Sequence, residues 1–166
     1  MTMPNPGRNF DQALLLIGRL NYAWTNTESL FVHLIAGLTP TDKETAVVIF
    51  LTLNTMRARV DLVERLAKLD RTPEAQRRRI LAATRRLVQL SAARNQYNHS
   101  IYSFDPATGD VRTILMRIAD RKDGIKMGRT DALDERAMAQ IQETIGELTR
   151  LNREIWAMVF DFGYPA

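Results

Sequence analysis

Apolar side chains recur at intervals of three and four residues along most of this chain, with few proline or glycine interruptions. This spacing is typical of amphipathic α-helices, because such residues lie on one helical face. Thr72 and Pro73 predict the start of a long helix, since a threonine cap followed by proline suits the first turn. The last helix is expected to begin at Thr130 or Asp131. Earlier helices are predicted over residues 10–36, 41–51 and 54–70.

One segment before the last helix departs from the helical pattern. Residues 101–104 and 111–118 are typical of strands, and they flank a turn sequence at residues 105–110, with a further turn at Asp123-Gly124. No internal repeat or long linker divides the chain. The sequence therefore predicts a single domain over residues 1–166, an all-α, up-and-down bundle of about five helices with a small β-hairpin insertion before the last helix.

Composition excludes several classes of protein. The 166 residues contain no cysteine, which rules out disulfide frameworks, thiol catalysis, thiolate zinc sites and iron–sulfur clusters and suits a reducing cytoplasm. The longest apolar run near the start, Ala13 to Ile17, is far shorter than a membrane span and lacks the features of an export signal. We expect a cytoplasmic protein with no membrane partner.

The formal net charge is +4, and its distribution is uneven. Residues 65–94 carry nine basic and two acidic side chains, whereas residues 131–166 carry seven acidic and three basic ones. A basic stretch of this kind is typical of surfaces that bind polyanions such as RNA. The same asymmetry is also compatible with a solvated helix face, with self-association or with docking of a partner.

Histidine occurs only at His33 and His99, so any imidazole chemistry depends on these two residues. His33 lies between Val32 and Leu34 in an apolar segment, which favours a structural role. Neither histidine has a carboxylate four residues away, as helical zinc ligands do, and the glycines form no phosphate-binding loop. We expect no metal and no cofactor.

His99 lies in a dense polar cluster over residues 94–102, near the end of the long helix. Arg94 offers a fork of donors that matches phosphate, His99 can give or take a proton, and Asn95 can orient the imidazole. Five residues rotate by about 140° on a helix, so Arg94 and His99 diverge unless the helix ends or a second copy faces the first. The alternative is that Asn98 and His99 only cap the helix.

The segment Arg94 to His99 resembles the signature of the HEPN superfamily, in which an arginine precedes a histidine by four to six positions in a helical bundle. The pattern Leu16 to Leu20, with Trp24 and Glu28, is similar to the first helix of many bacterial HEPN-like proteins. The resemblance implies a metal-independent endoribonuclease that acts as a homodimer, with paired sites from two subunits forming one cleft.

The resemblance also assigns roles to individual residues. His99 is expected to act as the general acid or base for attack of an RNA 2′-hydroxyl, Arg94 to stabilise the charged transition state and Asn95 to orient the cluster. Glu28 is a supporting partner for Arg94. Further RNA contacts are expected from Arg57, Arg59, Arg85, Tyr97, Asn98 and Tyr102, although structural packing is the simpler role for the two tyrosines.

Two other functions remain open from the sequence. The chain could be a noncatalytic module that binds RNA or an acidic partner, or a structural dimerisation protein whose polar cluster specifies the interface. In related toxin–antitoxin pairs, a nucleotidyltransferase antitoxin modifies a tyrosine two residues after the histidine. Here Ser100 and Ile101 follow His99 and the tyrosine is Tyr102. An antitoxin partner and a role in phage defence therefore stay open expectations.

Overall fold

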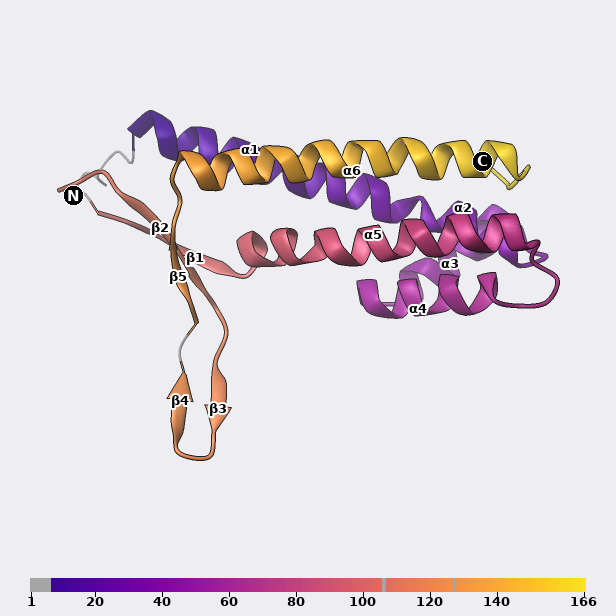
Figure 1. Cartoon of the computed structure of the whole chain (residues 1–166), viewed down its shortest axis with the longest axis horizontal. Helices are drawn as coiled ribbons and strands as arrows, with labels where there is room; N and C mark the ends of the chain where they lie inside the picture. Colours follow the sequence, from indigo (N-terminus) through magenta and orange to yellow (C-terminus); the bar gives the residue numbers. More distant parts are fainter. Residues whose placement is uncertain (1–6, 106, 127) are drawn as a thin grey trace. The chain divides into compact units, whose positions relative to one another are not determined.

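The computed structural model describes residues 7–105, 107–126 and 128–166, and the chain is mostly helical with small antiparallel sheets (Figure 1). The helices are α1 Gly7–Ser29, α2 Phe31–Leu38, α3 Lys43–Thr52, α4 Met56–Ala67, α5 Glu74–Asn98 and α6 Glu135–Asp161. Between α5 and α6 the strands are β1 Ser100–Phe104, β2 Val111–Leu115, β3 Ala119–Arg121, β4 Gly124–Lys126 and β5 Thr130–Ala132. None of the helices in these ranges is long and apolar enough to cross a membrane.

The single helix expected over residues 10–36 is wrong, because the chain turns at Leu30 between α1 and α2. The Leu30 amide donates to the Thr27 carbonyl at 3.3 Å, and the Leu30 carbonyl then accepts from His33 at 3.0 Å. Nearly every residue of α2 is buried, so apolar side chains follow one another across the break at Leu30. The spacing of apolar residues therefore does not reveal where α1 ends.

The helices predicted to begin at residues 41 and 54 are each capped one residue later. Asp42 caps α3 by accepting from the Thr45 amide at 2.7 Å, and Thr55 caps α4 by accepting from the Ala58 amide at 3.1 Å. At the start of α6, Asp134 accepts from the Ala137 amide at 2.8 Å. The expected start at residues 130–131 is wrong, because these residues belong to β5.

The sheet is larger than the expected hairpin. Strands β1, β2 and β5 form an antiparallel sheet in that order, with Ser100 opposite Leu115 and Thr113 opposite Asp131. Strands β3 and β4 form a separate two-stranded ribbon. Gly128 crosses close to β2: a Cβ atom on it would lie 1.7 Å from the Leu115 carbonyl oxygen, so only glycine fits this crossing.

The chain divides into two compact units. The sheet unit comprises the described residues of Met1–Tyr22 and Ser91–Gly146, and the helical unit comprises Ala23–Leu90 and Glu147–Ala166. The sheet unit buries Ala13, Leu16, Leu20, Tyr97, Thr113, Leu133 and Ile141. The helical unit buries a larger apolar core that includes Trp24, Phe31, Leu34, Ile35, Val60, Ile80, Leu87, Leu148, Leu151 and Ile155.

Candidate functional site

The helix α5 ends immediately before His99. The His99 amide donates to the Asn95 carbonyl at 3.1 Å in a last helical hydrogen bond, and Ser100 then begins β1. The His99 carbonyl accepts from the Met116 amide at 2.7 Å, which ties the end of α5 to the end of β2. The His99 side chain is exposed and Arg94 is half-buried. The helix end thus allows His99 to leave the direction set by α5.

His99 lines a groove of about 580 Å³ in the sheet unit, called here the His99 groove. Its polar side chains include Arg117 and Arg129, and Arg129 Nε lies 2.7 Å from Asp131 Oδ2. The groove therefore combines one imidazole with two guanidinium groups. Arg129 is paired with Asp131, whereas Arg117 forms no ion pair with a described residue, and its fork of donors suits a phosphate ligand. The complete lining is Ala92, Asn95, Gln96, His99, Leu115, Met116, Arg117, Arg129 and Asp131.

Sequence reasoning missed Arg117 and Arg129. Arg117 lies beside His99 because β1 pairs with β2 and the Met116 amide donates to the His99 carbonyl at 2.7 Å. Arg129 lies there because the chain returns from the β3–β4 ribbon, where the Leu115 amide donates to the Arg129 carbonyl at 3.0 Å. A signal was present, because residues 116–129 carry five basic and two acidic side chains. Apart from Arg117, at the end of the strand predicted over residues 111–118, these basic residues follow the predicted strands and belong to no recognised motif. Only the folded structure connects them with His99.

Asn95 connects Arg94 with the His99 groove. Arg94 Nη1 donates to Asn95 Oδ1 at 3.0 Å, and Asn95 itself lines the groove beside His99. Among the described residues, the Asn95 side chain forms no hydrogen bond with the His99 imidazole, which the sequence had suggested. The bond between the two residues runs from the His99 backbone amide to the Asn95 backbone carbonyl. Asn95 therefore both accepts from the Arg94 guanidinium and lines the groove, whereas Arg94 itself is not among the residues that line it.

The other polar residues of the cluster hold the sheet unit together. Asn98 Nδ2 donates to Asn21 Oδ1 of α1 at 2.6 Å, and the Tyr102 hydroxyl donates to the Tyr97 carbonyl at 2.8 Å. The Tyr102 ring also meets Phe10 edge to face, with centroids 6.5 Å apart. Tyr97 is 6% exposed. Both tyrosines are packed, as the simpler interpretation predicted.

Burial raises the pKa of the Tyr97 phenol above its usual value of 10, and the carboxylates of Asp131 and Asp134 add to the shift. Because the pKa of Tyr97 is raised in the folded chain, its contribution to the free energy of unfolding is fully present below pH 10. This contribution is lost as the pH rises through the folded-state pKa. We predict that the urea midpoint falls above pH 10 and that Tyr97→Phe weakens this fall. Tyr22→Phe, at an exposed side chain, is the control and should leave the fall unchanged.

The remaining expected RNA contacts belong to the helical unit. Arg57 forms an exposed ion pair with Asp61 at 3.0 Å. Arg85 is exposed and lines a groove of about 350 Å³ together with Arg57, Val60, Glu64, Lys68, Leu81 and Val88. This groove has three basic side chains and one acidic side chain, so it is a second candidate surface for phosphate.

Arg59 and Glu28 form a structural cluster within the helical unit. Arg59 Nη1 lies 3.0 Å from Glu28 Oε1, Arg59 Nε donates to the Phe50 carbonyl at 3.2 Å, and the guanidinium carbon lies 4.0 Å from the Phe50 ring centroid. Glu28 Oε2 accepts from Trp24 Nε1 at 3.1 Å. These contacts occupy the Arg59 guanidinium, which was expected to contact RNA, and the Glu28 carboxylate, which was expected to support Arg94.

His33 has the structural role expected for it. Its Nδ1 lies 2.8 Å from the Pro165 carbonyl oxygen, and its ring centroid lies 4.9 Å from that of Trp156. The side chain is buried in the helical unit. Among the described residues, no group of three or more His, Asp or Glu side chains is placed to hold a metal ion.

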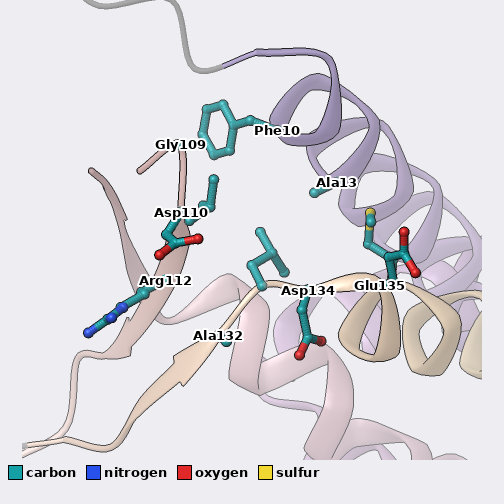
Figure 2. Close-up of a pocket in the computed structure, with 11 residues that line it drawn as sticks. Phe10, Ala13, Gly109, Asp110, Arg112, Ala132, Asp134 and Glu135 are labelled. Atoms are coloured by element: carbon teal, nitrogen blue, oxygen red, sulfur yellow. The ribbon is translucent and has the colours of Figure 1, made fainter. Parts of the chain in front are cut away.

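A second cavity of the sheet unit, of about 340 Å³, contains none of the expected site residues (Figure 2). Phe10 and Ala13 of α1 line it with Asp110 and Arg112 at the start of β2, and Asp134 and Glu135 lie at the start of α6. Asp134 already serves as the cap of α6. None of the described residues that line this cavity carries an imidazole, an amine or a hydroxyl nucleophile, so the His99 groove is the stronger candidate site.

No known protein family matches the chain, and no curated protein or solved structure matches it. The resemblance to HEPN proteins therefore depends on residues 94–99 near the end of α5 and on the pattern of residues 16–20 with Trp24 and Glu28 in α1. The features that bear on function are those of the His99 groove: its one imidazole, its two arginines and the exposed position of His99.

Proposed function

We propose that this chain is a metal-independent endoribonuclease of the HEPN type, built on an up-and-down helical bundle and acting as a homodimer in the cytoplasm. The observation that supports it best is that His99 and Asn95 share one groove with Arg117 and Arg129. An imidazole next to several guanidinium groups suits cleavage of a phosphodiester, because the reaction needs proton transfer and stabilisation of an anionic transition state.

In this proposal, His99 takes the proton from an RNA 2′-hydroxyl, and the 2′-oxygen attacks the adjacent phosphorus. The bond between phosphorus and the 5′-oxygen breaks, and that oxygen receives a proton. The products are a 2′,3′-cyclic phosphate and a 5′-hydroxyl end. Arg94, Arg117 and Arg129 stabilise the additional negative charge on the phosphoryl oxygens.

The proposed homodimer supplies the second proton carrier. One imidazole cannot accept the 2′-hydroxyl proton and donate another to the leaving oxygen in the same step, and His99 is the only histidine in the groove. His99 of a second copy, facing the same phosphate, would donate that proton. An antitoxin that covers this composite site is a further proposed partner.

The test is incubation of the purified chain with single-stranded RNA, an RNA hairpin and transfer RNA, each in excess EDTA. We expect cleavage, with 5′ ends that polynucleotide kinase labels directly and 3′ ends that resist phosphatase until acid opens the cyclic phosphate. Cleavage that requires a divalent ion, or products with 5′-phosphate ends, would contradict the proposal.

A noncatalytic RNA-binding module is the second candidate. It is favoured by the presence of basic grooves in both units, the His99 groove and the groove of Arg57, Lys68 and Arg85, since binding alone needs only phosphate contacts. Intact RNA on the whole substrate panel, together with salt-sensitive binding, would identify this function instead.

A further inference from the structure

The β3–β4 ribbon and the segments that join it to β2 and β5 form a basic arm, defined here as residues 116–126 with 128 and 129. The ribbon extends beyond the end of the three-stranded sheet (Figure 1). Every residue from Met116 to Lys126 is exposed, and among the described strands β3 pairs only with β4. An isolated two-stranded ribbon gains little stability in water, so burial in a core does not explain this insertion.

The register gives the ribbon two different faces. Ala119 lies opposite Lys126 and Arg121 lies opposite Gly124, so the Arg121 and Lys126 side chains share one face. Asp120 lies opposite Ile125 on the other face. Ile118 precedes Asp120 by two residues, and the Ile118 and Ile125 side chains are 63% and 67% exposed. One face is therefore cationic and the other is mainly apolar.

Positive charge extends from this cationic face to the His99 groove. Arg117 and Arg129, at the base of the arm, line the groove, and Arg121, Lys122 and Lys126 lie farther along the ribbon. Arg117, Arg121, Lys122 and Lys126 form no ion pair with any described residue. These four cations are available to an anionic partner.

We propose that the basic arm binds the RNA backbone on one side of the His99 groove, with Arg121 and Lys126 contacting phosphates beyond the cleaved one. The inference rests on the proposed action on RNA and adds to it a second part of the substrate site. Four residues of extended chain span roughly 13 Å, so Arg121 lies well beyond Arg117 along the arm. Phosphate contacts of this kind carry no base preference, and the arm should strengthen binding of all single-stranded sequences alike.

The test measures RNA affinity without cleavage, in chains that all carry His99→Ala. A fluorescent single-stranded RNA 20-mer is titrated by anisotropy at several KCl concentrations. Replacing Arg121 and Lys126 with glutamine should weaken binding several-fold at about 100 mM salt. It should also reduce the slope of log affinity against log salt by about 1.4, since each phosphate contact on a single strand contributes about 0.7.

Two matched variants control this measurement. Lys43→Gln with Arg153→Gln removes the same charge from exposed positions of the helical unit that lie outside the basic stretch 65–94, and Ile118→Thr with Ile125→Thr changes the opposite face of the ribbon. Both should leave the salt slope unchanged. An unchanged slope in the Arg121 and Lys126 variant, or a larger loss of affinity in the isoleucine variant, would overturn the proposal. The second result would indicate apolar docking instead.

The outcome is independent of whether the chain cleaves RNA. Binding that depends on the arm, in a protein whose wild type leaves RNA intact, would support the arm and contradict the proposed nuclease. If the wild type cleaves RNA and the Arg121 and Lys126 variant binds RNA normally, the proposed nuclease is supported and the proposed RNA-binding role of the arm is overturned.

Discussion

His99→Ala should lower the rate of RNA cleavage by about 100- to 10,000-fold, which is the usual contribution of a positioned general acid or base. The His99 side chain is exposed at the junction of α5 and β1, and the hydrogen bonds made there are made by its backbone. Alanine retains those backbone bonds, so the fold and the affinity for RNA should change little. Single-turnover cleavage in EDTA with excess protein measures the chemical step.

Gln96→Ala is the matched control for this prediction. Gln96 lines the same groove but does not titrate, and its backbone carbonyl, which accepts from the Ser100 hydroxyl, is retained in the variant. Its cleavage rate should stay within a few-fold of the wild type. If His99→Ala cleaved RNA as fast as Gln96→Ala, the imidazole would have no part in the chemistry, and the groove would be only a binding surface.

The helical character of the chain is predictable because apolar residues recur every three or four positions along it. The spacing of Ile80, Ala83, Leu87 and Leu90 predicts that these side chains share the inward face of α5; the first three are buried and Leu90 is half-buried. The break at Leu30 was not predictable in this way. Both α1 and α2 bury apolar side chains, so the hydrophobic pattern continues across the residue that separates the two helices.

Strand β5 shows a second limit of local spacing. Residues 130–132 have the sequence Thr-Asp-Ala, which has no alternation of apolar and polar side chains and resembles a helix cap. They form a strand because Arg112, Thr113 and Ile114 of β2 lie opposite them. The pairing is a tertiary interaction between segments about twenty residues apart, so short-range patterns do not reveal it.

The candidate site divides in the same manner. Asn95 and His99 are neighbours on one helical turn, so the sequence alone could place them together. Arg117 joins them only through the pairing of β1 with β2, and Arg129 only through the return of the chain from the β3–β4 ribbon. Conversely, Arg59 was expected at an RNA surface, and its contacts with Glu28 across 31 residues and with the Phe50 ring were not visible in the sequence.

Removal of the Glu28 carboxylate should destabilise the helical unit by about 2–3 kcal/mol. Glu28 accepts hydrogen bonds from Arg59 and Trp24, and the Arg59 and Glu28 side chains are only 18% and 11% exposed. Glu28→Ala would leave the Arg59 guanidinium, packed on Phe50, without its carboxylate. Urea unfolding followed by circular dichroism measures the change in free energy of unfolding.

Asp61→Ala provides the control, because the Asp61 carboxylate also pairs with an arginine of α4 but in a more open position. The Arg57 and Asp61 side chains are 73% and 33% exposed, so solvent screens the pair and its loss should cost less than about 0.5 kcal/mol. Equal losses in Asp61→Ala and Glu28→Ala would contradict a structural role for the Glu28 cluster. Glu28→Gln keeps the size and an acceptor oxygen but removes the charge, so an intermediate loss would separate the ion pair from the hydrogen bonds.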